Sequence, residues 1–224
     1  SQSIGLVFTA MAVDYFPRLS AVCHDNVKIK EMANQQGEVT LLLAAPVLLL
    51  LILCAPLMIQ VLLSKEFLPA ISFVRILALG MLFKAASYSI GAISFAKGDK
   101  KTFFILEGCY TNFSTLCFNV IGYYFYGLTG LAYSFLMMHV TYFIVINIVN
   151  WKLYDFSISR EVKFIMLVQF CLIVSEFLIL LKFSNLFGYT LAILLTVFSL
   201  LFSYKLLDKK IGIREIINKK ILRK

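Results

Sequence analysis

A lysine stands near the centre of one of the apolar segments of this sequence. Lys84 lies about twelve residues from either end of segment 71–96, whose composition otherwise suits the interior of a membrane. Twelve helical residues rise about 18 Å, too far for the side chain to reach either membrane surface. Because a charge at mid-membrane costs about 2.5–3.5 kcal/mol, we expect Lys84 to face water, an anion or a carboxylate.

Glu107, in the next apolar segment, is the nearest carboxylate in sequence. The sequence leaves two roles for Lys84 equally open: a structural ion pair with Glu107, and a lysine that faces a substrate. A third arrangement pairs Glu107 with Lys97 or Lys101 at the end of its segment.

Arg75 begins the segment that contains Lys84, nine residues earlier. Nine residues correspond to about 900° on an ideal helix, so the two cations lie on opposite faces. Arg75 is close enough to the segment end to anchor at lipid headgroups, which is the simpler expectation. We include it beside Lys84 among the candidate substrate-binding residues.

Two further ionisable residues lie deep in apolar segments. Glu176 can pair with Lys182 or with a neighbouring helix, and His139 titrates near neutral pH when it is unperturbed. With Glu107, these two are the candidates for carrying a coupling proton. A neutral His139 that is hydrogen-bonded across helices is the structural alternative.

Asn112 and Asn119 are seven residues apart and share one helical face. They suit the wall of a polar cavity, and we add them to the candidate substrate-binding residues. Interhelical hydrogen bonding, as for Asn147 and Gln169, is the simpler expectation for both.

The composition identifies an all-α integral membrane protein. Hydrophobic residues make up 61% of the chain and charged residues 15%, against about 25% charged in soluble domains. No metal-binding, nucleotide-binding or nucleophile motif occurs, so we expect no metal, cofactor or catalytic residue. The net charge of +9 is explained by loops beside anionic lipids, without nucleic acid.

The apolar segments predict about seven membrane spans, of which the first is partial. The partial span covers 1–16 and stops at Pro17; the others cover about 41–63, 71–96, 102–126, 128–149, 162–182 and 186–206. Polar, basic connections at 17–40, 97–101 and 150–163, with the tail, hold seventeen of the 21 Lys and Arg residues. The positive-inside rule therefore predicts that these connections and the C-terminus are cytoplasmic.

Several segments, in their order, resemble the polysaccharide-export and O-antigen flippases of the multidrug/oligosaccharidyl-lipid/polysaccharide exporter superfamily. They are "AVDYFPRLS", Pro56 with "SKEF", "LGMLFKAASYSIG", "FAKGDKK" and "YGLTGLAYS". The resemblance covers essentially the whole chain and aligns it with the C-terminal half of such a protein. It implies a C-terminal transport lobe at 1–150 and two appended helices at 151–207. Residues 208–224, in which lysines alternate with isoleucines, are expected to form a basic amphipathic cytoplasmic tail.

The resemblance also implies a function. Such flippases move an undecaprenyl-pyrophosphate-linked oligosaccharide across the bacterial inner membrane by alternating access, without covalent chemistry. Lys84 would then hold the pyrophosphate, and membrane lipids and a missing N-terminal half of the same protein would be the other partners. The alternatives are a cation-coupled multidrug exporter of the same superfamily and a membrane enzyme of glycan assembly, such as a polymerase or acyltransferase.

Overall fold

The computed structural model describes residues 14–62, 70–183 and 185–211, and these are helical with short connections. Residues 14–21 form a helix, and the further elements are α2 (Asn26–Leu62), α3 (Ala70–Ala96), α4 (Lys100–Phe103), the π-helix η2 (Phe104–Tyr110), α5 (Thr111–Tyr154), α6 (Arg160–Lys182) and α7 (Leu186–Ile211). Five helical segments in the described ranges are long and apolar enough to cross a membrane. The chain is a polytopic helical membrane protein, as its composition predicts.

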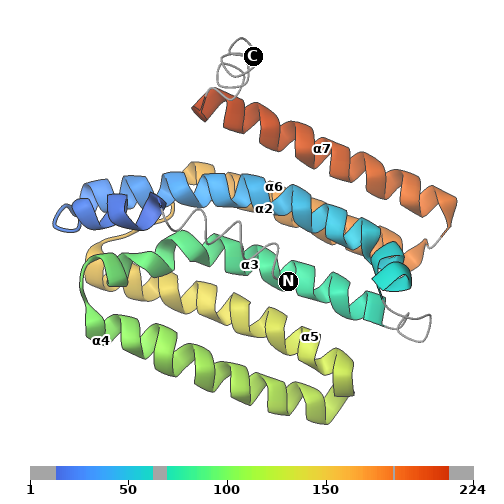
Figure 1. Cartoon of the computed structure of the whole chain (residues 1–224), viewed down its shortest axis with the longest axis horizontal. Coiled ribbons are helices and arrows are strands. Elements are labelled where there is room, and N and C mark those ends of the chain that lie inside the picture. Colours follow the sequence, from blue (N-terminus) through green and yellow to red (C-terminus); the bar gives the residue numbers. More distant parts are fainter. Residues whose placement is uncertain (1–13, 63–69, 184, 212–224) are drawn as a thin grey trace.

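The longest helical segment reverses direction at a glycine. Lys100–Tyr154 contains 55 residues, which would extend about 80 Å if straight, far more than the ~30 Å hydrocarbon core. Gly127 breaks it with φ 58° and ψ −137°, a conformation open to residues without a Cβ. Figure 1 shows the resulting hairpin, whose turn falls between the expected spans 102–126 and 128–149.

Two glycines let the arms of this hairpin approach closely. A Cβ on Gly122 would meet the Ser134 hydroxyl and the carbonyl of Gly130, and a Cβ on Gly130 would overlap the Gly122 carbonyl. At this crossing, the Ser134 hydroxyl donates a hydrogen bond to the carbonyl of Phe118 or to that of Gly130. Small residues at helix crossings are typical of membrane proteins, where backbones must pack without a hydrophobic driving force.

The helices run alongside one another, with α7 at one edge and the first arm of the α5 hairpin at the opposite edge (Figure 1). Helices α2, α3, α6 and α7 contribute the larger apolar core, which includes Leu42, Leu49, Leu82 and Ile173. A second core joins residues 14–29, the end of α3 and the second arm of α5. Helix α3 contributes to both cores.

The polar segment 17–40 is not the connection that its hydropathy suggests. The first helix continues past Pro17 to residue 21, and α2 begins at Asn26. Pro17 restricts mainly the turn before it, so the following residues remain helical. Asp25 starts α2 by accepting hydrogen bonds from the backbone N–H groups of Val27 and Lys28 at 3.0 and 3.1 Å. Hydropathy marks the residues that enter lipid, whereas this helix extends beyond them.

Asn34 ties α2 to the connection between α5 and α6. Its amide nitrogen donates to the carbonyls of Lys30 and Ser157 at 2.8 and 3.1 Å, and its amide oxygen accepts from the Ser159 N–H at 2.7 Å. The side chain is only 7% exposed. It therefore satisfies the backbone polar groups of a non-helical segment near the membrane.

The basic connections gather at one end of the helices (Figure 1). Lys97 donates to the Cys23 carbonyl at 3.0 Å and to the Asn26 side chain at 2.7 Å. Nearby, the Tyr154 hydroxyl donates to Asp99 at 2.7 Å. The positive-inside rule places these basic connections on one side of the membrane, and in the structure they lie at one end of the helices. Their location in the cytoplasm stays a prediction.

Asp99 caps the helix that follows it. Its carboxylate accepts from the Thr102 backbone N–H at 3.0 Å and from the Thr102 hydroxyl at 2.7 Å. These bonds, led by the backbone N–H, and the bond from Tyr154 favour the charged form and lower the pKa of Asp99 below its usual 3.8.

We predict that Asn34→Ala lowers the free energy of unfolding by about 1–3 kcal/mol, because it leaves the Ser159 N–H and the Ser157 carbonyl without their partner. Thermal unfolding of the purified protein in detergent measures the effect. Gln35→Ala is the matched control, since Gln35 is exposed and makes no hydrogen bond in the described residues. Equal unfolding midpoints for the two variants would contradict this role of Asn34.

A second prediction concerns pH. Because the folded-state pKa of Asp99 is lowered, its stabilisation is fully present above the usual pKa and is lost as the pH falls through the lowered value. The difference in unfolding midpoint between wild type and Asp99→Asn should therefore shrink from neutral pH to below about pH 3. Asp155→Asn, which changes an exposed carboxylate, is the control. A difference that stays constant with pH would refute the assignment.

Candidate functional site

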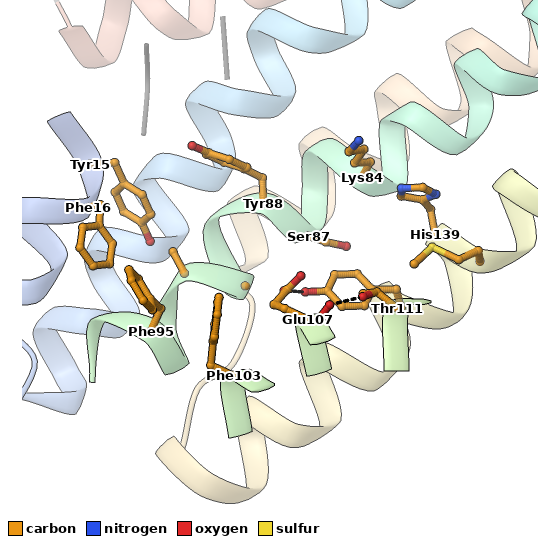
Figure 2. Close-up of a pocket in the computed structure, with 14 residues that line it drawn as sticks. Tyr15, Phe16, Lys84, Ser87, Tyr88, Phe95, Phe103, Glu107, Thr111 and His139 are labelled. Carbon is orange, nitrogen blue, oxygen red and sulfur yellow. Dashed lines mark hydrogen bonds between the residues drawn. The ribbon is translucent and has the colours of Figure 1, made fainter. Parts of the chain in front are cut away.

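A cavity of about 540 Å³ lies between residues 15–16, α3, the α4–η2 segment and the second arm of α5. Three of the ionisable residues singled out from the sequence line it: Lys84, Glu107 and His139. Figure 2 shows Lys84 and His139 on facing helices at one end of the cavity, with Phe95 and Phe103 at the other end. The structure thus brings together residues from three separate apolar segments.

Lys84 faces this cavity from the middle of α3. Its side chain is exposed and forms no hydrogen bond or ion pair with the described residues. The structural ion pair with Glu107 is therefore absent here, although both residues line the same space. The ammonium is left available to a ligand or to water.

Glu107 enters the cavity from a π-helical turn. The segment Phe104–Tyr110 is π-helical, and such turns are rare and frequently occur at functional sites. The Tyr142 hydroxyl on α5 donates a hydrogen bond to the Glu107 carboxylate. Gly91 on α3 makes room for this pair, because a Cβ there would lie 3.2 Å from the Tyr142 hydroxyl and 3.3 Å from the carboxylate.

The expected pairing of Glu107 with Lys97 is wrong, because Lys97 bonds Cys23 and Asn26 instead. Nor does Glu107 form an ion pair with Lys101 among the described residues. The sequence analysis also missed Tyr142, since a tyrosine in an apolar segment resembles an ordinary packing residue. The sequence analysis found no pattern that predicts the π-helical turn.

His139 lies where this cavity meets a second one. Its Nδ1 is 2.9 Å from the Phe135 carbonyl of its own helix, so the expected hydrogen bond across helices is not the one formed. The second cavity, of about 420 Å³, shares His139 and Met138 with the first. Its other lining residues are Phe73, Leu77, Thr115, Asn119, Leu131, Ser134 and Phe135.

The two asparagines of the predicted polar face differ in their surroundings. Asn119 lines the second cavity and makes no hydrogen bond with the described residues. Asn112 is exposed, donates to the Gly108 carbonyl at 2.6 Å and lines neither cavity. Neither asparagine forms an interhelical hydrogen bond in the described part of the chain. Their part in substrate binding stays a prediction.

Arg75 points away from the cavity. It is 8% exposed, and one of its guanidinium nitrogens donates to the Leu180 carbonyl on α6 at 3.3 Å. The two cations of α3 do lie on different faces, as helical geometry requires. Anchoring of Arg75 at the headgroups is wrong, because α6 covers this face and supplies an internal acceptor.

Glu176 belongs to a polar seam between α6 and α7. It is fully buried and accepts a hydrogen bond from the Thr196 hydroxyl at 3.2 Å, with Arg75 close enough to act on its charge. Two turns away, Gln169 accepts from Ser199 at 2.7 Å and donates to Ser203 at 3.0 Å. The partner of Glu176 is thus a neighbouring helix, and this seam does not line either cavity.

The described residues contain no group of three or more His, Cys, Asp or Glu side chains that could hold a metal ion. The side chains that line the main cavity include the Lys84 ammonium, which has no hydrogen-bonding partner among the described residues, and the His139 imidazole. They also include the Glu107 carboxylate, which accepts a hydrogen bond from Tyr142, and several aromatic rings. This set suits binding of a polar, anionic group in an otherwise apolar environment.

Comparison with protein families gives a match over part of the chain. Residues 3–72 match the family model described as polysaccharide biosynthesis protein, a stretch that ends at the start of α3 and does not include Lys84. No curated protein and no solved structure matches the chain. The similarity to polysaccharide biosynthesis proteins therefore covers less than half of the chain. The five helical segments that are able to cross a membrane make the chain a multi-pass membrane protein.

Proposed function

We propose that this chain is part of a flippase that moves a lipid-linked oligosaccharide across the bacterial inner membrane. The observation that carries the proposal is the ammonium of Lys84. It lies at mid-span, faces a cavity of about 540 Å³ and has no hydrogen-bonding or ionic partner among the described residues. The similarity of residues 3–72 to polysaccharide biosynthesis proteins supports the choice of substrate.

An unpaired intramembrane cation has a plain use in such a protein. The pyrophosphate of an undecaprenyl carrier must leave the headgroup region and cross a medium of low dielectric constant, where its charge is strongly disfavoured. A lysine in a hydrated cavity supplies a compact opposite charge with three hydrogen-bond donors. Lys84 thereby lowers the cost of bringing the phosphates to the membrane centre.

Transport would proceed by alternating access, with no covalent step. The cavity is bounded by residues 15–16, α3, η2 and α5 on this chain, and an N-terminal lobe of the same protein would complete it. This role is that of a transporter and not of an enzyme. Undecaprenyl pyrophosphate carrying an oligosaccharide is the cargo, and the membrane lipids surround the apolar faces of α5, α6 and α7.

The candidates for a coupling proton differ in their access to the cargo. Glu107 and His139 line the cavity that contains Lys84, so their protonation states act directly on an anion bound there. Glu176 lies on the far side of α3, buried with Thr196. We therefore propose Glu107 and His139 ahead of Glu176 as the groups that link a proton to transport.

The function is tested by replacing Lys84 in the complete protein, in a host that lacks its own copy. Lys84→Ala should abolish surface polysaccharide, and Lys84→Arg should retain part of it because the charge is kept. Lys152→Ala is the control, since Lys152 is an exposed lysine that does not line the cavity. Normal surface polysaccharide with Lys84→Ala, at equal protein levels, would refute the proposal.

The orientation is tested with a reporter phosphatase that is active in the periplasm. A fusion after Lys224 should be inactive, because the basic tail is expected in the cytoplasm. A fusion after Lys182, at the opposite end of α6, should be active. The reverse pair of activities would overturn the topology.

A further inference from the structure

The cavity beyond His139 offers different chemistry from the one that contains Lys84. Among its lining residues none is Asp, Glu, Lys or Arg, and the rings of Phe73 and Phe135 form part of its wall. The Asn119 amide and the Thr115 hydroxyl make no hydrogen bond with the described residues. This cavity therefore combines apolar surface with free, uncharged hydrogen-bonding groups.

The two cavities meet at Met138 and His139, which line both. Phe73 lies eleven residues before Lys84 on α3, about 16 Å along the helix axis. The second cavity thus extends from the centre of the membrane toward the end of α3 that is remote from the basic connections. One elongated ligand can occupy both spaces if its charged part lies at Lys84 and an uncharged part lies beyond His139.

We propose that the second cavity is a saccharide subsite, which receives the sugar next to the pyrophosphate while Lys84 holds the phosphates. The inference rests on the proposed function and deepens it. Sugars present hydroxyl and amide groups together with apolar ring faces, which suits Asn119 and Thr115 beside two phenylalanine rings.

A hydrocarbon chain is the less suitable occupant of this subsite. It would remove water from the Asn119 amide without replacing its hydrogen bonds, at a cost of about 1–3 kcal/mol. The carrier's hydrocarbon has the surrounding lipid as an alternative environment, whereas the sugar has none in the membrane. The geometry therefore directs the sugar inward and leaves the prenyl chain to the bilayer.

The experiment compares two probes on the complete protein, purified in detergent. One probe is undecaprenyl pyrophosphate, and the other is the same lipid carrying one N-acetylglucosamine. Wild type should bind the sugar-bearing probe more tightly. Asn119→Ala should weaken that probe about tenfold, equivalent to about 1.4 kcal/mol, and leave the sugar-free probe unchanged.

Asn147→Ala is the matched control, because Asn147 also belongs to α5 but lines neither cavity; it should leave both affinities unchanged. Thr115→Ala is the second variant, at an exposed residue whose replacement does not disturb packing. It should weaken the sugar-bearing probe selectively as well, which keeps the test decisive if Asn119→Ala does not fold.

The outcomes separate the subsite from the function. Lys84→Ala should weaken both probes. If it does so while Asn119→Ala and Thr115→Ala change neither affinity, or change both affinities equally, the saccharide subsite is wrong and the proposed function stands. If wild type binds both probes equally, the subsite is likewise wrong. If Lys84→Ala changes neither affinity, the proposed function fails.

Discussion

The structure depends on one constraint: an ionisable group inside a membrane must have a partner, a hydrated space or a neutral form. The helices meet this constraint differently on the two faces of α3. On one face, Arg75 and Glu176 are enclosed by α3, α6 and α7, with the Leu180 carbonyl and the Thr196 hydroxyl as partners. On the other face, Lys84 faces a cavity. The polar groups of the first face serve helix packing, and those of the second are available for binding.

Helix α3 makes this division possible because many of its residues have small side chains. Its buried residues include several small ones, which allow close backbone approach: Gly80, Ala85, Ala86, Ser87 and Ser89. A Cβ on Gly80 would lie 2.7 Å from the ring of Phe135. The helix therefore packs tightly against both α2 and α5, so that the wall bearing Lys84 is continuous with the protein core.

Much of this could be predicted from the sequence, because the cost of burying charge is visible in composition. The apolar segments predicted the helical membrane fold, and helical periodicity placed Arg75 and Lys84 on opposite faces. The sequence could not reveal that residues 26–40 are helical, since a helix that extends into water needs no apolar pattern. It also could not show that α6 covers Arg75, because the side chain's length allowed an equally good position at the membrane surface.

The π-helical turn at Phe104–Tyr110 has a consequence for the whole first arm of the hairpin. A π-turn accommodates one more residue than an α-turn, so its conversion to α-helix would rotate the residues on one side of it by about 100° relative to those on the other. The far end of the arm is fixed where Gly122 meets Gly130, and a rotation must therefore begin at the turn itself. Glu107 would then leave Tyr142, and the cavity would lose the carboxylate that this turn now presents to it.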